Sequence, residues 1–228
     1  MERIVLLLFL SSVAVGSFVP HLPSFAVSSV RDGACATADQ AKTKACFSTF
    51  YQSFGIDPAN IPPYMDFVND YEIILHKYGT AGVGITCTYV DSLKKCLGPL
   101  AQPSPCTKPD SFMTMFNLDK TNASDYAVDN AIRMYECTQQ QVMTDNIKCL
   151  KDIAENHMSD ILACSNAINS EIASGVPTCT AFDDYITCMV SFYVKQCGNG
   201  IKSFICNMEE IAMNFSSNDY CKEQMQKC

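Results

Sequence analysis

This 228-residue chain contains few residues whose type and spacing suggest catalysis. His76 and His157 could act as an acid and a base in a ribonuclease-like site. The chain contains no G-x-S-x-G or H-E-x-x-H pattern and no histidine pair at catalytic spacing. Surface positions are therefore the simpler expectation for both histidines, and we assign no catalytic residue.

Two acidic pairs and one glycine-rich string are further candidates. Asp183-Asp184 and Glu209-Glu210 could hold protons, but adjacent side chains on a helix do not face one another, so we expect a solvated face for each pair. Residues 79–84 read GTAGVG, but no Lys-Ser/Thr follows them, so we expect a loop and not a phosphate cradle. We predict no cofactor.

Cysteines are the most numerous reactive residues. Pairs at metal-ligand spacing are absent, since the closest two have six residues between them, so we predict no metal site. An even number of cysteines in an oxidising compartment typically forms a disulfide framework. We therefore predict that all fourteen form disulfides: Cys35, Cys46, Cys87, Cys96, Cys106, Cys137, Cys149, Cys164, Cys179, Cys188, Cys197, Cys206, Cys221 and Cys228.

The N-terminal segment indicates the compartment. A basic start is followed by an apolar run of about a dozen residues and by small residues, which predicts a signal peptide over 1–17 and a mature tail over 18–34. Sequons at Asn122 and Asn214 are candidate glycosylation sites on the same route. We expect a secreted, extracellular protein that does not insert into a membrane after cleavage.

The composition and net charge restrict the classes of partner that the protein is expected to bind. Apolar residues make up 48% of the chain, which is enough for a folded core. The net charge of −8 argues against nucleic acid and against an anionic membrane surface as the main partner.

Apolar residues recur at helical spacing, and no convincing hairpin signal interrupts them. The pattern predicts helices over 182–193 and 201–215, separated by a turn at 198–200. A further helix is expected over 125–137 with Ser124 as its N-cap, and a long helical stretch over 139–172. The predicted fold is all-α, built of disulfide-stapled helical hairpins.

The cysteine-rich helical domain, residues 35–228, contains two similar segments. Residues 86–96 and 178–188 both read T-C-T-x-[V/F]-D-x-x-x-x-C, and a third cysteine follows each. Amphipathic helices of similar composition could converge on such strings, but the matches favour related halves at about 35–110 and 122–228. Cys35 and Cys46 would then correspond to Cys137 and Cys149.

The spacing of four late cysteines restricts their pairing. Cys179, Cys188, Cys197 and Cys206 lie nine residues apart, which is about 13.5 Å along one helix. A disulfide needs Cα atoms about 4.4–6.8 Å apart, so neighbours within one helix cannot bond. Cys188 and Cys206 lie symmetrically about the predicted turn and form a candidate pair.

Eleven methionines accompany many phenylalanines. Such side chains can line a cavity for a lipid, although a plain helical core with methionine as filler explains them more simply. Residues 111–116, SFMTMF, are either an exposed contact patch or part of that core.

The segments TCTAFDDYITCMVSFYVKQCG, IKSFICNMEEIA and CTYVDSLKKCLGPL carry a family resemblance. Between about Cys35 and Cys221 the chain resembles the nematode-expanded secreted family named domain of unknown function 19. It is also similar to the insect haemolymph glycoproteins of about 27 kDa, which share a C-x8-C-x8-C segment. Both resemblances imply a secreted helical protein without established enzymatic activity, and neither supplies a catalytic residue.

These observations favour a secreted, non-enzymatic protein that binds an extracellular protein partner through a rigid helical surface. The alternative is a carrier of a lipid or another hydrophobic small molecule.

Overall fold

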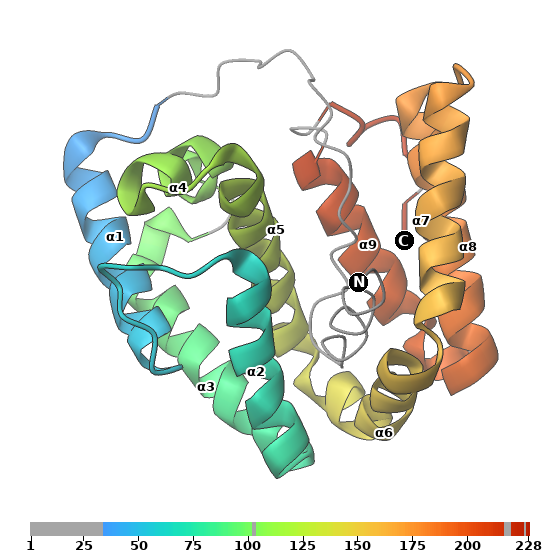
Figure 1. Ribbon diagram of the computed structural model, residues 1–228, viewed down its shortest axis with the longest axis horizontal. Helices are drawn as coiled ribbons and strands as arrows, with labels where there is room; N and C mark the ends of the chain where they lie inside the picture. Colours follow the sequence, from blue (N-terminus) through green and yellow to red (C-terminus); the bar gives the residue numbers. More distant parts are fainter. Residues whose placement is uncertain (1–33, 102–103, 217–219, 226) are drawn as a thin grey trace, which may run out of the picture.

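The computed structural model describes residues 34–101, 104–216, 220–225 and 227–228, and over these ranges the protein is all-α (Figure 1). The predicted fold class is confirmed. The described α-helices are α1 (Thr37–Gln52), α2 (Tyr64–Tyr78), α3 (Thr80–Leu97), α4 (Pro109–Phe116), α5 (Lys120–Glu136), α6 (Gln140–Asn156), α7 (Met158–Ala173), α8 (Thr178–Cys197) and α9 (Lys202–Ser216). Short 3₁₀ turns η1 (Gly98–Leu100), η2 (Pro105–Thr107), η3 (Cys137–Gln139) and η4 (Asn199–Ile201) lie between them. The predicted signal peptide lies outside the described residues.

The helices form two groups that meet along α5 and α9 (Figure 1). In the first group α1, α2 and α3 pack together, and α4 packs on α5. In the second group α8 lies between α7 and α9, and its contact with α9 is the hairpin predicted about residues 198–200. Helix α6 follows α5 and contacts both α3 and α8, and inner residues of α2 and α3 belong to the core of the second group; a second core fills the rest of the first group.

Two helix boundaries differ from the prediction. Helix α5 begins at Lys120, because the Asp119 side chain accepts a hydrogen bond from the Asn122 amide and caps the helix; Ser124 lies inside it. The stretch over 139–172 is two helices that break at His157, although no proline or glycine is present there.

The glycine-rich string is not a loop, so that expectation was wrong. Gly79 ends α2 with φ +55°, and Thr80 already begins α3. Gly82 lies where α3 crosses the end of α2, and a Cβ on it would stand 2.8 Å from the Ile74 carbonyl oxygen. The string therefore permits a close backbone contact between two helices.

All fourteen cysteines lie in the described residues and form seven disulfides. The bonds are Cys35–Cys106, Cys46–Cys96, Cys87–Cys137, Cys149–Cys197, Cys164–Cys188, Cys179–Cys221 and Cys206–Cys228. A framework of this kind indicates an oxidising environment.

The pairing of the four cysteines at nine-residue spacing, Cys179 to Cys206, agrees in part with the prediction from helix geometry. No two neighbours of that series are joined, as predicted. The proposed pair Cys188–Cys206 was wrong: Cys188 bonds Cys164 on α7, and Cys206 bonds Cys228 at the chain end. Helix α8 is packed on both sides, and Cys188 lies on its α7 side, away from α9.

The disulfides repeat one order along the chain. Among the first six cysteines, residues 35–137, the first bonds the fifth, the second the fourth and the third the sixth. The next six, at 149, 164, 179, 188, 197 and 221, are paired in the same order, apart from the added Cys206–Cys228 bond. Related halves remain a prediction. By its place in this order Cys35 matches Cys149 and not Cys137, and the Cys87–Cys137 bond joins the two ranges expected for the halves.

The interior is filled by aromatic, aliphatic and methionine side chains. A cluster of rings around Phe47 and Tyr51 occupies the first group of helices. Six methionines are buried, and all of them except Met115 lie in the core of the second group: Met115, Met143, Met189, Met208, Met213 and Met225. Of the segment 111–116, Phe112 and Met115 are buried, which places this segment in the core and not on an exposed patch.

Candidate functional site

Three charged residues lie on one buried face of α5. Arg133 is 1% exposed, and its guanidinium lies 3.0 Å from an Asp129 carboxylate oxygen and 3.2 Å from a Glu136 oxygen. The spacing explains the arrangement, because residues three and four apart stand above one another on a helix. An ionised arginine in a protein interior requires such partners.

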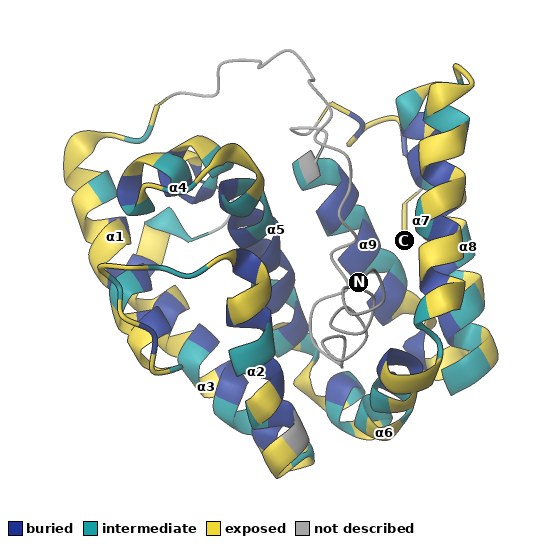
Figure 2. Ribbon diagram, viewed as in Figure 1, coloured by how far each residue is buried: buried dark blue, intermediate teal, exposed yellow. Residues whose placement is uncertain are grey.

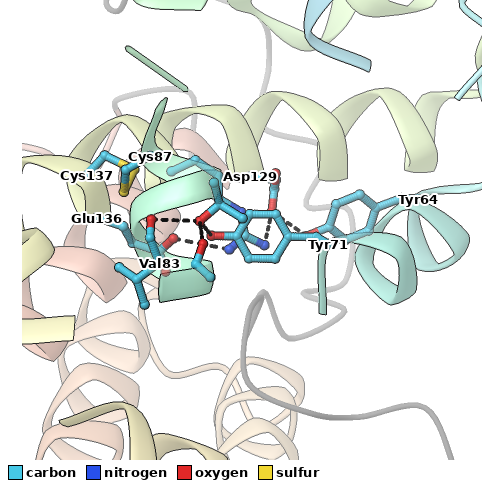
Figure 3. A network of polar contacts seen from close by, with 10 residues as sticks. Tyr64, Tyr71, Val83, Cys87, Asp129, Glu136 and Cys137 are labelled. Atoms are coloured by element: carbon cyan, nitrogen blue, oxygen red, sulfur yellow. Dashed lines mark hydrogen bonds and ion pairs between the residues drawn. A yellow bond between two sulfur atoms is a disulfide. The ribbon is translucent and has the colours of Figure 1, made fainter. Parts of the chain in front are cut away.

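Helix α2 completes this charged cluster from the opposite side (Figure 3). The Tyr71 ring centroid lies 3.6 Å from the Arg133 guanidinium carbon, which is a cation–π contact. The Tyr64 hydroxyl donates a hydrogen bond of 2.9 Å to Asp129. The Tyr71 hydroxyl donates one of 3.3 Å to Thr86 on α3. Three helices thus meet at one arginine.

Protonation in the cluster is set by burial and by the charges. Burial raises the pKa of Glu136 to about 7, and the neighbouring Arg133 limits that rise. Burial opposes the charge on Arg133, but Asp129, Tyr71 and Glu136 outweigh it and raise the arginine pKa well above its ordinary value. The groups are sealed from water, so the cluster positions helices and offers no surface to a substrate.

Another buried carboxyl, apart from this cluster, lies on α9. The Glu209 side chain is inaccessible to water and lies among Tyr185 and Tyr193 of α8. Burial raises the pKa of Glu209 to about 8, and the nearby Tyr185 hydroxyl reduces that rise. Neither carboxyl oxygen has a hydrogen bond of good geometry within the described residues. These surroundings favour the protonated, uncharged form of Glu209 over the carboxylate.

The expectation of a solvated face for the pair Glu209-Glu210 was therefore half wrong. Adjacent helical positions are about 100° apart, so one side chain faces the core and the other faces outward. Glu210 is partly exposed and lies 3.3 Å from Lys227. On α8, Asp184 is exposed and Asp183 is half-buried.

Of the two candidate histidines, the structure describes the side chain of His157. His157 lies between α6 and α7, with its ring nitrogens 3.2 Å from Asp160 and 3.9 Å from Asp152. These contacts join the ends of two helices. The side chain of His76 lies outside the described parts of the structure.

The sequons occupy different settings. The Asn122 side chain donates to Asp119 at 2.6 Å and accepts from the Tyr64 amide at 2.7 Å, so it joins the start of α2 to the start of α5. Asn214 is half-buried in the last turns of α9. Glycosylation of both remains a prediction, and at Asn122 a glycan would compete with the bond to Asp119.

Helix α2 also has an outer face, defined here by Met65, Asp66, Asp70 and Ile73. Met65 and Ile73 are exposed by 39% and 59%, Asp66 is exposed and Asp70 is half-buried. Figure 2 shows that α2 has both exposed and buried segments. Tyr78, at the end of the helix, is exposed by 46%. Three of the five exposed large hydrophobic side chains among the described residues thus lie on this one helix.

Among the described residues, no helix is long and apolar enough to cross a membrane. Those residues also hold no group of three or more histidine, cysteine or acidic side chains that could bind a metal ion. Comparison of the chain with protein-family models, curated proteins and solved structures finds no match.

Proposed function

We propose that this is a secreted, non-enzymatic binding protein that presents a rigid helical surface to an extracellular protein partner. One contrast supports the proposal. The acidic and basic groups with strongly raised pKa values are sealed inside, whereas large apolar side chains stand in water on the surfaces of helices. Catalysis needs the reverse, because a shifted group must reach its substrate.

The framework suits binding. Seven disulfides connect the helices, and each typically contributes about 2–4 kcal/mol against the unfolded chain. A surface fixed in this way loses little conformational entropy when a partner binds. Exposed apolar side chains on such a surface are typical of protein contact sites.

The competing function is transport of a hydrophobic small molecule. The buried methionines fill the core alongside aromatic side chains, which favours the protein-binding function.

Two measurements on the mature protein, after its expression in a secretory host, decide between the two functions. The first is its native intact mass after glycan removal, followed by organic extraction. The second is capture of proteins from extracellular fluid of the source organism, with reconstitution of the complex from purified components. A reconstituted one-to-one protein complex supports the proposal. A stoichiometric lipid with no protein complex overturns it.

A further inference from the structure

The seven disulfides differ in their exposure to solvent. Five of them include a buried cysteine, and in Cys149–Cys197 both residues are half-buried. In Cys206–Cys228 neither residue is buried, since Cys206 is half-buried and Cys228 is exposed. Thiol–disulfide exchange requires that a thiolate reach one of the two sulfur atoms, so this bond is the most accessible of the seven to exchange.

The Cys206–Cys228 bond is also the one that the repeated pairing order does not include. The second set of six cysteines is fully paired without it. The chain just before Cys228 has its own covalent anchor, because Cys221 bonds Cys179 of α8 and both of these residues are buried. Opening Cys206–Cys228 therefore leaves six bonds in place, including the one that ties residues 220–225 to α8.

The Cys206–Cys228 bond restrains a short stretch that covers part of the core. Met225 is 4% exposed and belongs to the core of the second group. The amides of Gln224 and Met225 donate hydrogen bonds of 2.9 Å to the Cys221 carbonyl, which form a turn within the stretch and no link to α9. Lys227 lies 3.3 Å from Glu210 of α9, but an ion pair with an exposed lysine contributes little. The disulfide to Cys206 is thus the covalent restraint that keeps Met225 against the core.

We infer that Cys206–Cys228 is a site of thiol–disulfide exchange, at which a dithiol opens this one bond and frees Met225 from the core while the other six bonds stay closed. The opening is local, because the bond lies outside the repeated framework and the stretch keeps its anchor at Cys221. This site goes beyond the proposed binding function and does not depend on it.

The exchange has two steps. One thiolate of the dithiol attacks Sγ of Cys228, the exposed residue, and forms a mixed disulfide, while Sγ of Cys206 leaves as a thiolate and takes up a proton. The second thiolate of the dithiol then attacks the dithiol's own sulfur in the mixed disulfide and releases Cys228, which also takes up a proton. The protein gains two electrons and two protons, and the dithiol becomes a disulfide.

The first test is limited reduction of the full mature protein by dithiothreitol at neutral pH without denaturant. New thiols are trapped with N-ethylmaleimide at successive times and located by peptide mass spectrometry. We expect the first product to carry the label on Cys206 and Cys228, and to form at least about tenfold faster than any product labelled elsewhere. Cys46–Cys96 is the matched control, because Cys96 is exposed but Cys46 is buried.

The second test measures the release of Met225 by its oxidation with hydrogen peroxide. Met208, on α9, is the matched control, since it is 6% exposed in the same core. After labelling of Cys206 and Cys228, we expect Met225 to be oxidised at least about tenfold faster and Met208 to change less than about twofold. The double variant Cys206→Ser/Cys228→Ser should give the same result without a label, with the circular dichroism of the wild type.

Several outcomes would overturn the inference. Opening of Cys46–Cys96 or Cys149–Cys197 at the same rate as Cys206–Cys228 would show that this bond is not a distinct exchange site. Unchanged oxidation of Met225 would show that the bond does not restrain it, and faster oxidation of Met208 as well would show general unfolding and not local release. Each of these results leaves the proposed binding function standing, because neither test measures binding.

Discussion

The Tyr64 hydroxyl, on α2, donates a hydrogen bond of 2.9 Å to the Asp129 carboxylate, on α5. The bond joins a helix that has no cysteine to the buried charged cluster. Asp129 in turn lies 3.0 Å from Arg133, and the Arg133 guanidinium makes a cation–π contact with the Tyr71 ring. Besides the apolar packing of Phe67, Val68 and Leu75, a few polar contacts hold α2, and these contacts can be tested one at a time.

Removing the Tyr64 hydroxyl should destabilise the protein. In Tyr64→Phe, Asp129 loses a buried hydrogen bond, and bonds to charged groups are worth about 1.5–3 kcal/mol. Urea unfolding of the disulfide-intact protein measures the change in free energy. Tyr78→Phe is the matched control, because Tyr78 is exposed at the end of the same helix, and it should change stability by less than about 0.5 kcal/mol. Equal stability of the two variants would contradict the importance of this bond.

Stability should fall as the pH rises from mildly acidic to mildly basic. Burial raises the pKa of Glu136 to about 7 and that of Glu209 to about 8, from an ordinary value of 4.5. The folded protein thus holds these protons more tightly than the unfolded chain does. Their contribution is complete below the unfolded pKa and is lost as the pH rises through the folded values.

Glu209→Gln separates this effect from other titrations. The variant keeps a neutral side chain of similar size, so relative to the wild type it should gain roughly 4 kcal/mol between about pH 5 and about pH 9. Unfolding measurements across that range give the difference. Asp184→Asn, at an exposed position on α8, is the surface control and should change the free energy of unfolding by less than about 0.5 kcal/mol. Parallel pH profiles for Glu209→Gln and the wild type would refute the assignment.

Two glycines of the same helix should respond to alanine in opposite directions. A Cβ on Gly82 would stand 2.8 Å and 3.0 Å from backbone atoms of α2, so Gly82→Ala should cost about 1–3 kcal/mol. A Cβ on Gly84 would meet only the Gln140 side chain, at 3.6 Å, so Gly84→Ala should stabilise α3 by about 0.5–1 kcal/mol. Melting temperatures measure both, and a shift in the same direction would refute the close contact.

Disulfide mapping should yield two separate sets of linked peptides. In denaturant without reductant, proteolysis followed by mass spectrometry should find linked pairs within residues 35–137 and within residues 149–228. A linked peptide that joins a cysteine of one range to a cysteine of the other would disprove the pairing order.

Much of the helical fold could be predicted from the sequence, because each helix buries one face and so repeats its apolar residues. The turn at Gly198 and the pairing of α8 with α9 followed from that periodicity. Disulfide partners could not be predicted in the same way. Cys188 lies nine residues from Cys197, but which neighbouring helix it faces depends on the packing of α7 against α8.

The buried charges escaped the sequence analysis, although a signal for them existed. Glu209 lies four residues after Ile205 and three before Ala212, both in the apolar stripe, which places it on the core face. Arg133 has acidic residues four before and three after it, which is ion-pair spacing on a helix. The outer face of α2 gave no comparable signal, because the exposure of Ile73 depends on which face of the helix its neighbours cover.

The order of the disulfides has a consequence for synthesis. Cys137 is the last cysteine of the first set and precedes every cysteine of the second, so the first three bonds need nothing that is made later. A nascent chain that enters an oxidising lumen N-terminus first can complete the first half while the second is still being translated. Of the roughly 135,000 ways to pair fourteen cysteines, most link the two sets, and early closure of the first set removes them from competition. The linear separation of the two sets thus directs oxidation toward the native pairing.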